Sequence, residues 1–137
     1  MTSTKFVAVL NKKIEVGKAM NALAHMTVGL VNTYSSNKDM GVISYADKDN
    51  GNHFASKWPY IILKADNSNK IRTLRNALIE KGIPFASFTN AMTIGTWEEQ
   101  VEKSKSTPEI ELEYYGICML GEKSELNELT KKFSLWI

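Results

Sequence analysis

The stretch K-F-V-A-V-L-N at residues 5–11, followed by G-K-A-M-N-A-L-A-H at residues 17–25, decides the fold prediction for this chain. The first segment is apolar and rich in β-branched residues, which is typical of a buried strand. The second opens a helical pattern that runs from about Val16 to Tyr34. Its predicted core stripe, spaced three or four residues apart, consists of Ala19, Leu23, Met26 and Leu30. A strand followed by a long amphipathic helix predicts the opening unit of an α/β domain.

Strand and helix patterns continue to alternate along the rest of the chain. We predict further strands at residues 40–46, 58–64, 84–89 and 112–120. We predict further helices at residues 69–81, 93–104 and 124–133. The breakers at residues 47–52 predict a turn, with His53 in an exposed loop. The expected fold is α/β, with a three-layer α/β/α arrangement around a mixed four- or five-stranded sheet.

Composition limits the classes of function. The chain has 137 residues, 43% hydrophobic and 23% charged, which predicts a single soluble domain over residues 1–137. A net charge of +2 is small, so nucleic acid is not the expected partner. The apolar run at residues 6–10 is too short to cross a membrane, and residues 1–5 lead into a strand without a signal-peptide pattern. Cys118 is the single cysteine, which excludes a disulfide within the chain and favours a cytoplasmic location.

One face of the first helix carries the strongest candidate site. Lys18 and His25 are seven residues apart, so they return to nearly the same side of a helix, with Asn21 and Ala22 between them. The unpaired N–H groups of the helix start, next to Gly17, suit an anion or a carbonyl oxygen. Alternatively, the histidine is a packed residue and the lysine is solvated.

A second group of polar residues follows the strand at 84–89. Thr89 and Asn90 end that strand, and Thr93 and Thr96 follow in the next segment. Because open α/β sheets bind ligands at strand ends, we expect this group to line the same crevice as the helix face. The alternative role for these residues is capping of the next helix.

The chain lacks the patterns of several other kinds of site. Gly17-Lys18 is followed by alanine and lacks the flanking glycines of a phosphate-binding loop. One cysteine and two histidines give no spaced zinc ligand set, so we expect no metal and no cofactor. Cys118 lies in an apolar run and is expected to be a buried hydrophobic residue. Lys12, Lys13 and Lys18 form a basic rim that suits a phosphate.

Over nearly its whole length the chain resembles the family known as domain of unknown function 2000. The segments that carry this resemblance are residues 5–11, G-K-A-M-N-A-L-A-H at 17–25, F-T-N-A-M at 88–92, Gly116, Gly121 and Leu135. That family is similar in fold to peptidyl-tRNA hydrolase II, which implies a mixed sheet between helical layers.

The resemblance also implies roles for single residues. Lys18 and His25 fall on the lysine and histidine of the hydrolase's first helix. The hydrolase's helix glutamine falls on Ala22, with Asn21 beside it as a displaced amide. The aspartate that follows the hydrolase's fourth strand falls on Asn90, which cannot accept a proton as a carboxylate does. The resemblance therefore implies a retained pocket with altered chemistry.

Three functions fit these observations. The first is a small-ligand-binding domain for an anionic metabolite, in which Lys18 holds the anion. The second is a divergent hydrolase of an ester or amide, with His25 as general base and Lys18 stabilising an oxyanion. The third is a structural oligomerisation domain, forming a homodimer through exposed aromatic residues, of which the candidates are Trp58, Trp97 and Trp136.

Overall fold

The computed structural model describes residues 3–137. Residues 1 and 2, which the single-domain and signal-peptide predictions include, lie outside the described residues. The elements in chain order are β1 (Thr4–Asn11), α1 (Val16–Tyr34), β2 (Val42–Ala46), β3 (Asn52–Ser56), β4 (Tyr60–Ala65), α2 (Ser68–Lys81), β5 (Phe85–Thr89), the 3-10 helix η1 (Asn90–Thr93), α3 (Trp97–Lys105), the 3-10 helix η2 (Glu109–Glu111), β6 (Tyr114–Glu122), α4 (Lys123–Thr130) and β7 (Ser134–Leu135).

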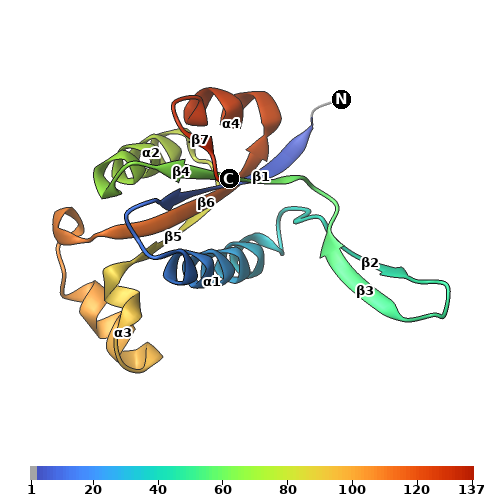
Figure 1. The fold of residues 1–137 in the computed structure, drawn as a ribbon, viewed down its shortest axis with the longest axis horizontal. Coiled ribbons are helices and arrows are strands. Elements are labelled where there is room, and N and C mark those ends of the chain that lie inside the picture. The colour runs from blue at the N-terminus through green and yellow to red at the C-terminus, as the bar shows by residue number, and fades with distance from the viewer. Residues whose placement is uncertain (1–2) are drawn as a thin grey trace.

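A five-stranded mixed sheet forms the centre of the described chain, in the order β5-β6-β1-β4-β7. β1 runs parallel to β4 and antiparallel to β6, while β5 and β7 lie antiparallel at the two edges. Figure 1 shows α2 and α4 on one side of this sheet and α1 on the other. The mixed α/β fold predicted from the sequence is therefore confirmed.

The central strand β1 is buried on both faces and joins two hydrophobic cores. Val7 and Val9 face α2 and α4, while Phe6, Ala8 and Leu10 face α1. Successive side chains of a strand point to opposite faces, so a continuous apolar run fits only a strand covered on both sides. Helix α1 covers its side with the fully buried Ala19 and Ala22 and with Met26 and Leu30. No helix within residues 3–137 is long and apolar enough to span a membrane.

Helix boundaries follow local capping chemistry. Helix α1 spans the predicted residues, and α2 begins where the Asn67 side chain accepts a hydrogen bond from the backbone N–H of Lys70. Helix α2 ends at Gly82, whose φ of 67° gives a left-handed cap. The helix predicted at residues 93–104 is confirmed as α3 but starts later, at Trp97, because Thr93 ends η1. Gly95, with φ of 56°, and the capping box of Thr96 start a new helix there.

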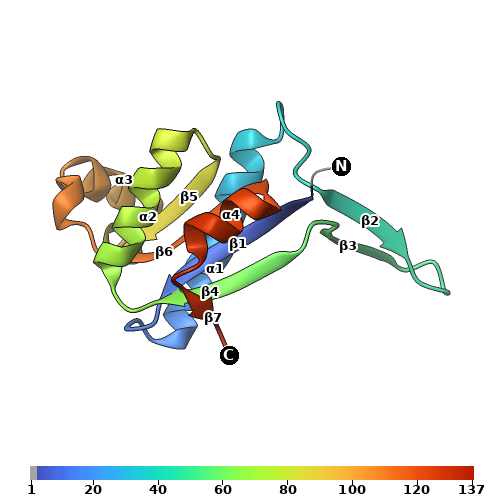
Figure 2. The ribbon, with the colours of Figure 1, turned by 90° about the horizontal axis from the view of Figure 1, so that it is seen from above.

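The segment after the turn at residues 47–52 also differs from the prediction. Residues 52–56 form strand β3, which pairs with β2 in a two-stranded sheet separate from the main one. His53 therefore lies on an exposed strand and not in a loop. Figures 1 and 2 show this hairpin projecting from the body beyond the start of β4. The β3 sequence N-H-F-A-S lacks a clear apolar alternation because none of its side chains is buried.

The approach of α1 to the sheet predicts a stability effect at Gly116. A Cβ there would lie 2.8 Å from Leu10 Cδ2, 2.9 Å from Met26 Cε and 3.3 Å from the Val9 carbonyl oxygen. We expect Gly116→Ala to lower the free energy of unfolding by about 1–3 kcal/mol through overpacking. The control is Gly29→Ala in α1, where a Cβ meets nothing within 4 Å. Urea unfolding should show that this control is neutral or stabilising by up to about 1 kcal/mol; a neutral Gly116→Ala would contradict the close approach.

Candidate functional site

A cleft of about 490 Å³ lies between the N-terminal half of α1 and the segments β5, η1, α3 and β6. Its lining residues are Gly17, Lys18, Asn21, His25, Phe88, Met92, Thr93, Gln100 and Tyr115. The polar face predicted for α1 therefore opens onto a cleft. Thr93, which was predicted from the separate segment after β5, lines the same cleft.

The polar residues of the α1 face are accessible. Lys18, Asn21 and His25 are exposed, whereas Ala19 and Ala22 are fully buried against the sheet, although the sequence places Ala22 on the side of Lys18 and His25. The one ion pair of Lys18 among the described residues is with Glu15, at 3.9 Å, with both side chains more than half exposed. Such a pair contributes little, so the ammonium group remains available to a ligand. A Cβ at Gly17 would meet no atom within 4 Å, so the helix start is also open.

A buried asparagine holds the start of the connection between β1 and α1. Asn11, 1% exposed at the end of β1, donates from Nδ2 to the Tyr114 carbonyl at 3.0 Å. Its Oδ1 accepts a hydrogen bond from the Lys13 backbone N–H at 2.9 Å.

The neighbouring Lys12 forms an ion pair with Asp66 at 2.8 Å. Of the basic rim predicted from the sequence, only Lys18 is a lining residue of the cleft.

Aromatic rings form one wall of the cleft. The rings of His25 and Phe88 lie 5.6 Å apart, and those of Phe88 and Tyr115 lie 6.1 Å apart, both tilted. Phe88 is only 6% exposed and contacts both outer rings. The wall offers an apolar surface beside the cation of Lys18, an arrangement that suits a ring bearing an anionic group.

Sequence reasoning did not assign Phe88, Met92, Gln100 or Tyr115 to the site. Tyr115 reaches the cleft because the pairing of β5 with β6 shifts register between Phe88 and Thr89. Strict alternation from Ile117 and Met119 would place Tyr115 under α2, but Tyr114 packs there instead. As a result of the shift, Tyr115 lies on the α1 side with Cys118 and Leu120. The position of Gln100 at the cleft depends on the packing of α3 against η1. The available signal is the segment at residues 88–92, which carries the family resemblance and contains both Phe88 and Met92.

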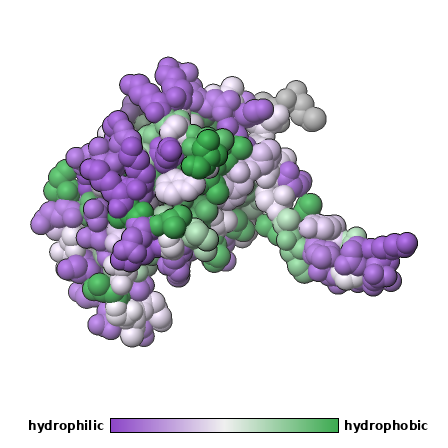
Figure 3. Space-filling view, viewed as in Figure 1, coloured by the Kyte–Doolittle hydropathy of each residue, from purple (hydrophilic) through white to green (hydrophobic). Residues whose placement is uncertain are grey.

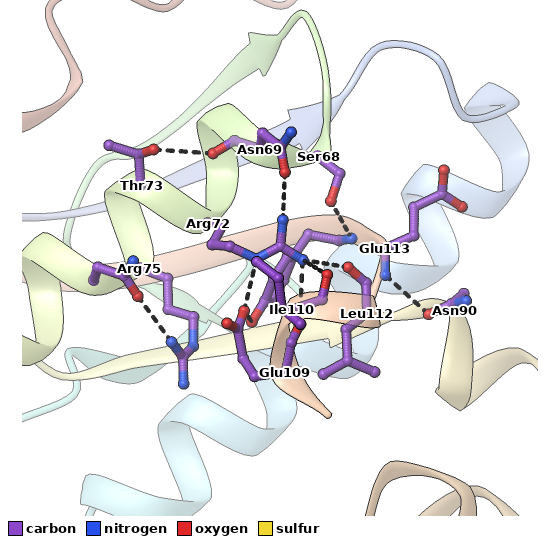
Figure 4. A network of polar contacts seen from close by, with 12 residues as sticks. Ser68, Asn69, Arg72, Thr73, Arg75, Asn90, Glu109, Ile110, Leu112 and Glu113 are labelled. Atoms are coloured by element: carbon purple, nitrogen blue, oxygen red, sulfur yellow. Dashed lines mark hydrogen bonds and ion pairs between the residues drawn. The ribbon is translucent and has the colours of Figure 1, made fainter. Parts of the chain in front are cut away.

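Thr89 and Asn90 do not line the cleft. Thr89 is buried, and its hydroxyl accepts a hydrogen bond from the Ala91 N–H at 3.3 Å, which caps η1. The backbone N–H of Asn90 donates to the Glu113 carbonyl at 2.9 Å, and its Oδ1 accepts from the Glu113 N–H at 3.1 Å (Figure 4). The Thr89 bond fits the capping alternative, whereas the two Asn90 bonds tie η1 to the chain that enters β6.

A buried arginine holds the segment that leads into β6. Arg72 of α2, 9% exposed, donates from Nε to Glu109 at 2.8 Å and from Nη2 to the Leu112 carbonyl (Figure 4). The Tyr114 hydroxyl donates to the same Glu109 carboxylate at 2.8 Å. The Tyr114 hydrogen bond, followed by the Arg72 contact, holds the pKa of Glu109 below its usual value. Burial, with the Glu109 contact, raises the pKa of Tyr114 to about 12.

Two further predictions concern metals and Cys118. Within residues 3–137, no group of three or more His, Cys, Asp or Glu side chains is placed to hold a metal ion. Cys118 is fully buried, as predicted, and burial raises the pKa of its thiol to about 11. A thiol of this kind is a poor nucleophile at neutral pH, and Cys118 is not among the cleft residues.

The hydrogen bonds of Arg72 and Tyr114 to Glu109 predict that the stability of the fold depends on pH. Because the pKa of Glu109 is lowered in the folded state, its stabilising effect is present above the unfolded pKa and is lost as pH falls through the folded pKa. We expect Glu109→Gln to unfold at a lower urea concentration than the wild type at pH 7, and this gap to close below about pH 4. Glu98→Gln is the control, since the exposed Glu98 forms no ion pair with another of residues 3–137. A difference in the urea concentration of unfolding that stays constant from pH 7 to pH 3 would contradict a stabilising role of the Glu109 carboxylate.

Comparison with known proteins places this geometry in a family. No curated protein matches the chain. A solved structure of a protein of unknown function, Atu0240, from Agrobacterium tumefaciens strain C58 is similar over 100% of both chains, with a TM-score of 0.84 and 16% sequence identity. At that identity the likeness extends to the fold alone. The family described as Protein of unknown function (DUF2000) matches residues 4–137, and the chain therefore belongs to this family.

Proposed function

We propose that this protein is a small-ligand-binding domain that takes an anionic metabolite in the cleft beside α1. The observation that carries the proposal is that one cleft of about 490 Å³ gathers a cation, amide groups and an aromatic wall. Binding sites of this kind are mostly apolar clefts with a few convergent polar groups.

The lining residues favour a ligand with two chemical parts. Lys18 and the open first turn of α1, which has no acidic residue and no side-chain cap, favour a phosphate or carboxylate group. The wall formed by His25, Phe88 and Tyr115 favours a planar ring. Asn21, Thr93 and Gln100 add side chains that donate and accept hydrogen bonds. An anionic compound with an aromatic or heteroaromatic ring therefore fits this cleft best.

The proposal includes a scaffold similar to peptidyl-tRNA hydrolase II. The family resemblance supports it, together with the placing of Lys18 and His25 on one helix face at a cleft. The hydrolase's aspartate position holds Asn90, which is bonded to the backbone of Glu113 and does not line the cleft. The described lining residues also include no carboxylate that would orient His25. These features favour ligand binding over hydrolysis of an ester or amide.

The first test measures binding of phenyl phosphate, a ring with an anionic group, to the full chain. Binding is monitored by the amide chemical shifts in an NMR titration. We expect shifts at Lys18, Asn21, His25 and Tyr115. The Lys18→Ala variant should weaken binding by about tenfold or more, because a hydrogen bond to a charged group contributes about 1.5–3 kcal/mol. Binding should also weaken with added salt, since the Lys18 side chain is 62% exposed.

The matched control is Lys38→Ala, a second exposed lysine that is not among the cleft residues. It should bind phenyl phosphate as the wild type does. Equal losses in both variants, or no binding of phenyl phosphate and of a panel of carboxylated and phosphorylated metabolites, would reject the proposal. Turnover of an ester or amide that disappears in His25→Ala would establish the hydrolase alternative instead.

A further inference from the structure

The hairpin of β2 and β3, residues 42–56, is an arm with both faces open to solvent. All residues of both strands are exposed, including Val42 at 62%, Tyr45 at 53% and Phe54 at 73%. The pairing places Val42 and Phe54 on one face, and Ile43 and Tyr45 on the other. An isolated two-stranded hairpin is marginally stable in water, so exposed apolar side chains on both of its faces indicate a surface that covers it.

The free end of the arm is built in one defined conformation. Asp47 Oδ1 accepts hydrogen bonds from the backbone N–H groups of Asp49 and Gly51, both at 2.9 Å. Its Oδ2 lies 2.8 Å from His53 Nε2, and the His53 ring stacks on Tyr45 at 5.1 Å. Contacts within the arm therefore arrange its side chains before any partner is met.

The base of the arm is fixed as well. The Lys57 backbone N–H donates to the Gly41 carbonyl at 2.7 Å, and its ammonium group pairs with Asp39 at 2.8 Å. The Trp58 ring lies so close to Gly41 that a Cβ there would come within 2.3 Å of it, and Gly41 has a φ of 74°. These contacts keep the arm pointing away from its own body, as Figure 3 shows at the right.

The body carries an apolar groove on the β4 side of α1. This α1–β4 groove, of about 540 Å³, is lined by Met20, Leu23, Ala24, Thr27, Val28, Tyr60 and Ile62. Met20 and Val28 are 63% and 71% exposed, so apolar side chains reach the surface there. The groove meets β4 and the cleft of the proposed function meets β5, so the two lie on different flanks of the same helix.

We propose that the occupant of this groove is the arm of a second copy of the chain, and that two copies exchange arms about a two-fold axis. Each strand of the arm has five residues and extends about 17 Å, close to the length of β4 at about 3.3 Å per residue. Because the arm projects beyond the start of β4, a two-fold partner's arm runs along β4 toward its end. Its tip then approaches Lys64, which lies on the Tyr60 and Ile62 side of the strand.

Charge and area both fit this pairing. Among the described residues neither Lys64 nor Asp49 of the arm tip forms an ion pair within its own chain, so each is free to meet the other across the dimer. A stable interface buries about 800 Å² on each partner. Arm exchange forms the arm–groove contact twice, so each contact has to supply only part of this area, and Phe54, 73% exposed on the same face of the arm as Val42, enters each contact.

Sedimentation velocity of the full chain tests the proposal. We expect a dimer at tens of micromolar. Phe54→Ser in the arm and Val28→Glu in the groove should each raise the dimer dissociation constant at least tenfold, because each lesion affects both contacts of a homodimer. Ile110→Ser is the matched control, since Ile110 is also 73% exposed and lies outside the arm and groove; it should leave the dimer unchanged.

Mixing the two variants separates arm exchange from any other dimer. In a mixed dimer, the Phe54→Ser arm meets the Val28→Glu groove, so both substitutions fall in one contact. The other contact joins an unchanged arm to an unchanged groove. The mixture should therefore associate more tightly than either variant alone. A monomeric wild type, a Val28→Glu variant that dimerises normally, or a mixture without this recovery would each overturn the proposal. Far-ultraviolet circular dichroism of the variants checks that each is folded.

Discussion

Between β6 and β4, strand β1 sends Val7 and Val9 into the core under α2 and α4, and Phe6, Ala8 and Leu10 into the core under α1. The other layers depend on this burial, because an apolar strand must be covered on both faces. The chain meets that requirement with α1 on one side and with α2 and α4 on the other. The polar end of β1 then fixes the next element, since the buried Asn11 positions the connection into α1.

Close packing of α1 on the sheet has consequences beyond stability. Gly116 leaves room for Met26 and Leu10, and the small Ala19 and Ala22 bring the helix down onto the strands. The helix lies closest to β5 and β6, and both of its flanks remain accessible. The flank beside β5 and α3 becomes the cleft with Lys18 and His25, and the flank beside β4 becomes the apolar α1–β4 groove. One helix thus separates two surfaces with different chemistry.

The edges of the cleft are held by polar contacts that involve no ligand. The hydrogen bonds between Asn90 and Glu113 tie η1 to the chain entering β6, and Arg72 fixes the preceding segment through Glu109. The register shift after Phe88 then turns Tyr115 toward α1. These contacts give the cleft a defined shape, which lowers the entropic cost of binding a ligand.

By itself the sequence determined the order of most elements, the span of α1 and the polar face with Lys18, Asn21 and His25, because these depend on periodicity and capping within short segments. It also determined the burial of Cys118, which lies in an apolar strand. Only the tertiary structure decided that Thr89 and Asn90 hold backbone groups, that Tyr115 and Gln100 reach the cleft, and that residues 42–56 form a projecting arm. These outcomes depend on a register shift, on the packing of α3 against η1 and on a strand with no buried face, and none of these leaves a periodic signal in the chain.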